Sequence, residues 1–135
     1  MNEAPLFLSR ADIDLIHDFS LKEYGGGAGV RDEGALESAI VAPVNYWNYE
    51  GVELDSWGWT MLAAIYWFHL SGNHPFIDGN KRTAFLAAKA FLDINGFGLT
   101  MSEDQAYDMA LKVAKGEFNR EALATTLHEF VEEQF

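Results

Sequence analysis

The feature that most restricts the fold is a stretch at residues 57–71 that is apolar on nearly every side of a helix. Such a helix must be buried against other elements, because too few of its positions can face water. A second, mostly apolar helix is predicted over residues 80–94, closed by Asn95 and Gly96. Two buried helices joined by a short connection predict an all-α domain, with amphipathic helices packed around the central pair.

Amphipathic helices are predicted before the central pair. Ser9 begins a capping-box pattern, and the glycine run at 25–27 ends the helix that follows it. Asp32 is placed to cap a second, short helix, which Pro43 is expected to stop because proline lacks the N–H group that a helix interior needs. Residues 44–56 show no helical period, so we expect a loop or a short hairpin before the central helix.

Two more helices are predicted after the central pair. One follows a capping box at Ser102 and ends at Gly116. Asn119 is expected to cap the other. The apolar face of this last helix is formed by Leu123, Leu127, Phe130 and Val131. Since no repeat or linker interrupts the pattern, residues 1–135 are expected to form a single compact domain.

Composition narrows the class of protein. The chain is 49% hydrophobic and has no cysteine, so it can form a core but no disulfide or thiolate metal site. The apolar stretch at 57–71 is too short to span a bilayer, and residues 1–12 do not resemble a signal peptide. A soluble, cytoplasmic protein is therefore expected.

The formal net charge of −12 argues against binding to nucleic acid through the phosphate backbone, which requires many lysines and arginines. The same charge suits a basic protein partner. It is explained equally by solubility alone, because acidity by itself carries little specificity.

Polar chemistry interrupts the most hydrophobic region of the chain, in the connection between the two central helices. Residues 72–85 read "GNHPFIDGNKRTAF". Asp78 is expected at or just before the start of the second central helix, and Gly79 lets the backbone turn tightly there. Lys81 and Arg82 then fall in the first helical turn, where positive charge opposes the helix dipole. A bound polyanion would remove that conflict, because a helix N-terminus binds phosphate groups well.

His74 and Asp78 complete a set of groups suited to phosphoryl transfer. A neutral imidazole can accept a hydroxyl proton, and a carboxylate beside phosphates is a usual protein ligand for Mg²⁺. One histidine and one aspartate are too few ligands for Zn²⁺.

Each residue of this set also has a purely structural explanation. His74 could hydrogen-bond within the loop, Asp78 could simply cap the helix, and Lys81 and Arg82 could point into solvent. Their combination within one short segment favours a functional site. Such a site requires that the first turn of the helix be open to solvent and that His74 face it.

The stretch "HPFIDGNKR" resembles the signature of the Fic/Doc family, and Lys81 within it is typical of the Doc branch. The resemblance extends to "GGGAGVRDEGALESAIVAP" upstream and to "AFLDINGFGLTMSEDQA" downstream. It therefore covers most of the chain and implies the small, all-α Fic-type domain.

The resemblance also implies a role for each residue of the signature. His74 would be the general base, Phe76 a buried anchor of the loop, and Asp78 the Mg²⁺ ligand. ATP phosphates would lie on an anion-binding turn formed by Gly79, Asn80, Lys81 and Arg82. The candidate catalytic residues are His74, Asp78, Lys81 and Arg82. The segment 46–55 would be the flap that positions the target polypeptide.

On this resemblance the chain would be the toxin of a bacterial toxin–antitoxin pair. Doc-type members transfer phosphate from ATP, with Mg²⁺, to a threonine of translation elongation factor Tu and so inhibit translation. Other Fic-type members transfer AMP instead. These carry glycine where this chain has Lys81, and a second arginine where it has Phe85. Phosphate transfer is therefore favoured, with AMP transfer and an inactive binding module as alternatives.

Other motifs admit two explanations or only a structural one. The aromatic residues Tyr46, Trp47, Tyr49 and Trp57 could stack on a nucleobase, grip a partner or belong to the core. His17, His69 and His128 are expected to be structural or exposed. The family's inhibitory helix motif is missing its last residue here, since Phe130 follows Glu129. We therefore expect inhibition by a separate antitoxin that binds as an amphipathic helix.

Overall fold

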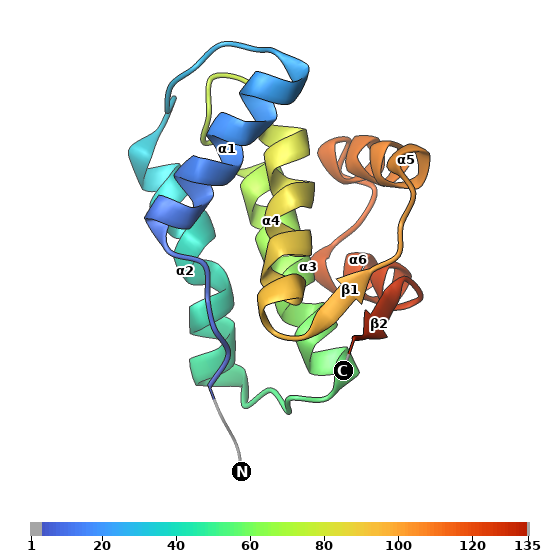
Figure 1. Cartoon of the computed structure of the whole chain (residues 1–135). Coiled ribbons are helices and arrows are strands. Elements are labelled where there is room, and N and C mark those ends of the chain that lie inside the picture. Colours follow the sequence, from blue (N-terminus) through green and yellow to red (C-terminus); the bar gives the residue numbers. More distant parts are fainter. Residues whose placement is uncertain (1–3, 135) are drawn as a thin grey trace.

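Two central helices organise the molecule. The computed structural model describes residues 4–134, in which helices α3 (Ser56–Gly72) and α4 (Asn80–Ile94) lie side by side at the centre (Figure 1). Helices α2, α5 and α6 all contact α3, and α1 packs against α4. Every residue of α3 from position 60 to 67 is buried. The predicted all-α class and the buried central pair are confirmed.

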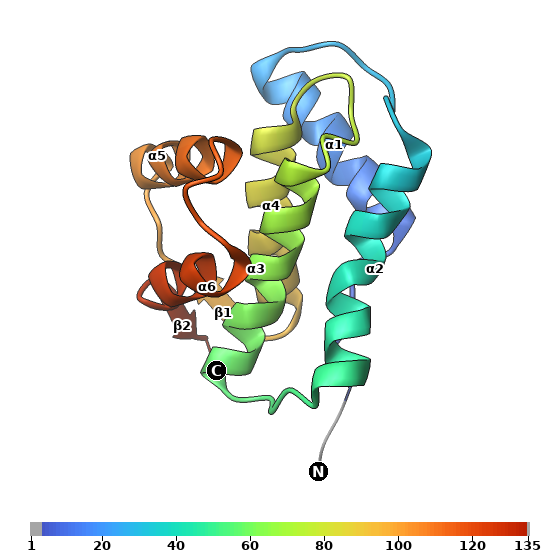
Figure 2. The same ribbon diagram turned by 180° about the vertical axis from the view of Figure 1, so that it is seen from behind.

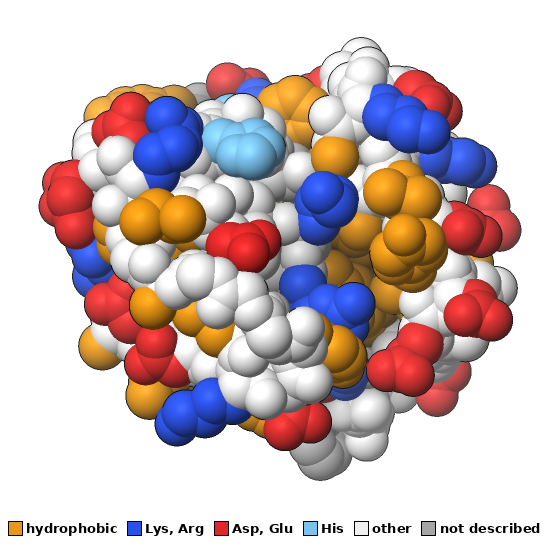
Figure 3. Space-filling model, turned by 90° about the horizontal axis from the view of Figure 1, so that it is seen from above, with side chains coloured by type: hydrophobic (Ala, Val, Ile, Leu, Met, Phe, Trp, Pro, Cys, Tyr) orange, Lys and Arg blue, Asp and Glu red, His pale blue; other side chains and the backbone are white. Residues whose placement is uncertain are grey.

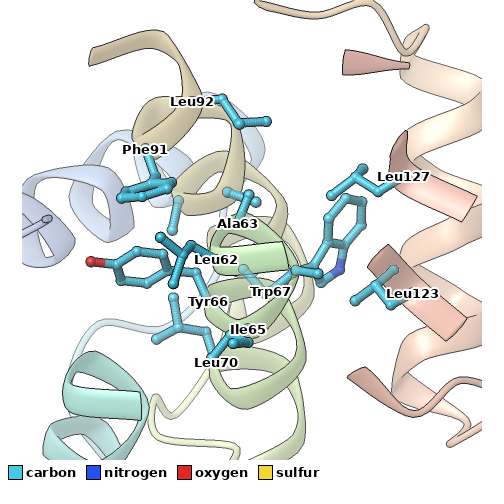
Figure 4. Packing of buried hydrophobic residues seen from close by; sticks show 14 of the residues in the cluster. Leu62, Ala63, Ile65, Tyr66, Trp67, Leu70, Phe91, Leu92, Leu123 and Leu127 are labelled. Carbon is cyan, nitrogen blue, oxygen red and sulfur yellow. The ribbon is translucent and has the colours of Figure 1, made fainter. Parts of the chain in front are cut away.

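The core is built on the side chains of α3. Tyr66 packs against Phe91 of α4 with ring centroids 5.1 Å apart, and Trp67 points the other way, toward Leu123 and Leu127 of α6 (Figure 4). The buried Tyr66 hydroxyl accepts a hydrogen bond of 2.9 Å from the backbone N–H of Leu8, which ties the N-terminal segment to the core. Burial also raises the pKa of Tyr66 above its ordinary value.

Helix starts follow the predicted capping signals. The hydroxyl of Ser9 accepts from the N–H of Asp12 at 3.1 Å, and the Asp12 carboxylate accepts in return, so α1 (Arg10–Tyr24) begins with a complete capping box. Ser102 makes the same arrangement at α5 (Glu103–Ala114). Asn119 caps α6 (Arg120–His128), and the N–H of Ala122 donates to its side chain.

The boundary of α2 was predicted wrongly. This helix, Glu33–Glu50, starts at the expected cap Asp32 but continues past Pro43 to Gly51, which adopts a left-handed conformation. A proline inside a helix costs about 3 kcal/mol. Pro43 itself is buried, and Tyr46 and Trp47 pack against the core, so burial of this face outweighs the lost hydrogen bond.

The region expected to form a flap is therefore mostly helix, followed by a connection at residues 51–55. This connection leads into the N-terminus of α3, whereas the signature loop follows the C-terminus of α3 (Figures 1 and 2). At 1.5 Å per residue, α3 separates the two loops by about 25 Å. Segment 46–55, assigned above as the flap that positions the target polypeptide, therefore lies at the opposite end of α3 from the signature loop, and that assignment is wrong for this chain.

A small antiparallel sheet was not predicted. Strands β1 (Phe97–Leu99) and β2 (Val131–Glu133) pair with Leu99 opposite Val131. Helix α6 ends at His128, so Val131, assigned above to its apolar face, lies in a strand instead. Three-residue strands are too short to show a period in the sequence.

Among residues 4–134, no helix combines the length and the apolar character needed to cross a membrane.

Two glycines of α3 provide a matched test of the packing at its start. A Cβ on Gly58 would overlap the carbonyl oxygen of Glu53 and lie 2.9 Å from Cγ1 of Val52, whereas a Cβ on Gly72 would meet nothing within 4 Å. We expect Gly58→Ala to lower the free energy of unfolding by about 2 kcal/mol or more. Gly72→Ala should be neutral or stabilise by about 0.5–1 kcal/mol, because alanine favours the helix. Urea denaturation measures both, and equal effects would contradict this packing.

Candidate active site

The signature forms the loop at residues 73–79 and the first turn of α4. Gly79 occupies the N-cap position with φ of 82°, and no side chain caps the helix. Asp78 lies just outside it, as expected. The N–H groups of the first turn are thus left for another acceptor, and together with the helix dipole they favour an anion.

A cavity of about 270 Å³ opens beside this turn, between α4 and α5. It brings together all the predicted site residues, which are His74, Asp78, Gly79, Asn80, Lys81 and Arg82. Its other wall is mainly apolar and includes Phe85, Leu86, Ala106, Tyr107 and Leu111. Seen from above, cationic side chains border a hollow with hydrophobic side chains inside it (Figure 3). The first turn is therefore open, and His74 lines the same space.

Asn80 holds the loop together from within. Its Oδ1 accepts from the N–H of Phe76 at 2.9 Å, and its Nδ2 donates to the carbonyl of Phe76, also at 2.9 Å. The side chain is buried, with 6% of its surface exposed. Although Asn80 was predicted to bind anions, its side chain points into the loop, which leaves only its backbone N–H for that purpose.

The same amide selects a tautomer of His74. Because Phe76 orients both ends of the amide, Nδ2 of Asn80 can only donate to Nδ1 of His74, which lies 3.2 Å away. Neutral His74 therefore carries its proton on Nε2 in this arrangement. His74 is exposed and, among residues 4–134, is the one non-glycine residue with positive φ, at 52°.

His17 supports the signature loop from the side of the core, a role that the sequence did not suggest. Its ring is buried and stacks on that of Phe76, with centroids 3.8 Å apart and planes 11° from parallel. Its Nε2 donates to the carbonyl of Asp78 at 2.9 Å. The one available signal was spacing, since His17 follows the buried Ile13 by four residues.

The carboxylate of Asp78 is anchored but still available. Oδ1 accepts from the N–H of Gly79 at 2.8 Å and Oδ2 from the N–H of Gly27 at 3.2 Å. Asp78 is exposed, and each oxygen can accept again. A Cβ on Gly26 would come within 2.9 Å of Oδ2, so the glycine run, expected only to end α1, also packs against this carboxylate.

These features fit Mg²⁺ better than a metal held wholly by protein. Within the described range 4–134, no three His, Cys, Asp or Glu side chains cluster closely enough to hold an ion. Mg²⁺ commonly takes one or two carboxylates, with water and substrate phosphates as its other ligands. Asp78 beside an anion-binding turn suits that pattern.

The two cations of the turn carry no carboxylate partner in the described part of the chain, whose ion pairs involve Arg10 and Lys89 instead. Lys81 is exposed. The guanidinium of Arg82 lies 3.4 Å from the ring centroid of Tyr24, at the side of the cavity. Both positive charges thus remain available to an anion.

The aromatic residues proposed for stacking lie elsewhere. Tyr46 and Trp47 pack against the core, while Tyr49 and Trp57 are exposed, and none of the four lines the cavity. The aromatic residues that do line it are Tyr24, Phe85 and Tyr107.

The loop is also paired with a segment far upstream, which the sequence did not suggest. Val30 and Phe76 form an isolated antiparallel bridge, and the N–H of Ile77 donates to the carbonyl of Gly29 at 3.0 Å. Residues 29–31, and not segment 46–55, therefore lie beside the signature.

Comparison with known proteins identifies the family of this chain. Residues 7–92 match the model of the Fic/DOC family. The chain is 37% identical over 109 residues to the "Toxin Doc" of Mycolicibacterium smegmatis, covering 79% of this chain and 82% of that protein. It is 31% identical over 120 residues to the "Protein kinase doc" of Escherichia phage P1, covering 89% and 91%. The chain therefore belongs to the Fic/DOC family.

Proposed function

We propose that this protein is the toxin of a bacterial toxin–antitoxin pair and that it transfers the γ-phosphate of ATP to a serine or threonine hydroxyl of a protein. The observation that carries the proposal is the meeting of His74, Asp78, Lys81 and Arg82 around one cavity at an uncapped helix start. One relative is named a toxin and another a protein kinase. Translation elongation factor Tu is the target we propose, on family resemblance.

Phosphates would bind at the first turn of α4. The turn offers unpaired N–H groups, the positive end of the dipole and two cations without carboxylate partners among residues 4–134. Lys81 and Arg82 oppose the dipole while the site is empty and are compensated when a triphosphate binds. Asp78 would hold Mg²⁺, which neutralises phosphate charge when bound.

The nucleoside would lie against the apolar wall between α4 and α5. Phe85 is half-buried there and packs edge-on against Trp67 at 5.3 Å. An arginine at position 85, as in AMP-transferring relatives, would grip the far end of the triphosphate. Phe85 offers no such contact, which supports phosphate transfer over AMP transfer.

His74 would act as the base. It takes the proton of the target hydroxyl as that oxygen bonds to the γ-phosphorus, while the bond from γ-phosphorus to the bridging oxygen breaks and ADP leaves. With Asn80 donating to Nδ1, the free electron pair of the resting ring is at Nδ1. Proton uptake there requires the 3.2 Å contact with Asn80 to open, which the exposed position of His74 permits.

An antitoxin would bind a second, shallow groove, which lies between α1 and α4 and is separate from the active-site cavity. Leu15 and Phe19 are 68% and 52% exposed there, and Leu86 and Ala90 of α4 form the opposite side. An amphipathic helix could bury these apolar groups. The net charge of −12 favours basic residues on such a partner.

The transferred group is tested with two labels. Purified protein is incubated with bacterial extract and ATP labelled on either the α- or the γ-phosphate. We expect protein-bound γ-label only, with elongation factor Tu as the labelled band. Protein-bound α-label would show AMP transfer instead. Absence of any label, together with no ATP-induced thermal shift, would support an inactive binding module.

The role of His74 is tested by His74→Ala. We expect transfer to fall at least about 100-fold, because general base catalysis contributes 10²–10⁴. The Kd for ATP should change less than about twofold, since His74 acts on the acceptor and not on the phosphates. His128→Ala, a histidine outside the cavity, is the matched control and should keep full activity. Wild-type rates in His74→Ala would refute the assignment.

Toxicity is tested by expression in bacteria without any antitoxin. We expect wild-type protein to arrest growth and translation, and His74→Ala to be tolerated at equal protein levels. Incorporation of labelled amino acids measures translation directly. Normal growth at high levels of folded wild-type protein would contradict the toxin assignment.

A further inference from the structure

We propose that Arg31, which lies outside the signature, is a positioning residue that holds the backbone of His74 so that its imidazole lies at the cavity beside the first turn of α4. The inference rests on the proposed role of His74 as the base. It begins from an unusual set of contacts, because Arg31 donates hydrogen bonds to the carbonyl oxygens of three successive residues, Asn73, His74 and Pro75.

The contacts of Arg31 surround the backbone of His74. Its Nε donates to the carbonyl of His74 at 2.7 Å, and Nη2 donates to that of Asn73 at 3.2 Å. Its backbone N–H donates to the carbonyl of Pro75 at 2.8 Å. Hydrogen bonds from a charged donor are stronger than neutral ones, and the planar guanidinium fixes their directions.

His74 needs such support. Its φ of 52° is unfavourable for a residue with a Cβ and persists only where the surroundings determine it. The carbonyl of His74 is turned toward Arg31 in this conformation, while its ring lies against Asn80. Arg31 therefore holds the backbone of His74, and Asn80 holds its ring in the resting site until the ring accepts a proton.

Arg31 forms no ion pair with a carboxylate among the described residues, although exposed arginines commonly do. The chain has 21 acidic and 9 basic residues, yet none of the ion pairs in the described range includes Arg31, although its side chain is exposed. Its guanidinium donates hydrogen bonds to backbone carbonyls of the signature loop instead.

Arg31 lies just before α2, whose start is hydrogen-bonded to the signature loop. Its neighbour Asp32 donates from its N–H to Pro75 at 3.1 Å and caps α2 through the N–H of Ala35. The side chain of Asn73 donates back to the carbonyl of Ala35 at 3.0 Å. The start of α2 and the signature loop thus donate hydrogen bonds to each other. These bonds fix the position of Arg31 relative to His74.

A purely structural role is the competing explanation. Asn73 is the C-cap of α3, and a cation at a helix C-terminus stabilises the helix through its dipole. In that case any cation at position 31 would serve, and only stability would change on its removal. Arg31→Lys separates the two explanations, because it keeps the charge but replaces the guanidinium fork with a single ammonium group.

The experiment compares Arg31→Ala and Arg31→Lys with Arg10→Ala. Arg10 is the matched control, since it hydrogen-bonds Asp14 and Glu33 and joins α1 to α2 without touching the loop. We measure kcat and KM for ATP, and ¹⁵N chemical shifts of the His74 ring. We expect Arg31→Ala to lower kcat at least about tenfold with KM for ATP within about twofold, and to lose the bias toward the Nε2–H tautomer. Arg31→Lys should restore stability but only part of kcat.

The outcomes separate this inference from the proposed function. Wild-type kcat and ring shifts in folded Arg31→Ala would overturn the inference, as would full recovery of kcat in Arg31→Lys or an equal loss in Arg10→Ala. If Arg31→Ala does not fold, Arg31→Lys decides by the same two readouts. If the wild-type protein transfers no phosphate, the proposed function fails and the ring shifts alone decide whether Arg31 positions His74.

Discussion

The site depends on one side chain, the carboxamide of Asn80, which binds both the N–H and the carbonyl of Phe76 at 2.9 Å. These two bonds close the signature loop onto the first turn of α4 and orient the amide that faces His74. Phe76 is buried and stacked on His17, so the polar loop is anchored in the core. This arrangement lets an exposed, strained histidine and an uncapped helix start exist side by side without loss of order.

Local signals predicted the helices well where packing agreed with them. The bounds of α4 match the prediction because Gly79 and Asn95 flank it, and the cap at Ser9 formed as expected. Pro43 shows the opposite case, since burial of the face it belongs to outweighed its local preference. The strands β1 and β2 depend on pairing between distant segments and left no local pattern.

The sequence predicted only those residues of the candidate site that lie close together along the chain. The signature residues share one short segment, so their chemistry could be inferred together. Arg31 and His17 reach the loop across 43 and 61 residues, and no spacing rule connects such positions. Asn80 was found but assigned to the anion, because a sequence does not show which way a side chain turns at the start of a helix.

These long-range contacts set the order in which the loop can be completed. The hairpin of α3 and α4 on its own lacks the bond from His17 to Asp78 and the bonds from Arg31 to the loop. A nascent chain on the ribosome therefore cannot finish this loop until α4 has emerged and packed against the earlier helices. An incomplete translation product that ends before α4 would therefore lack both the helix start and the folded loop, and with them the turn on which the proposed activity depends.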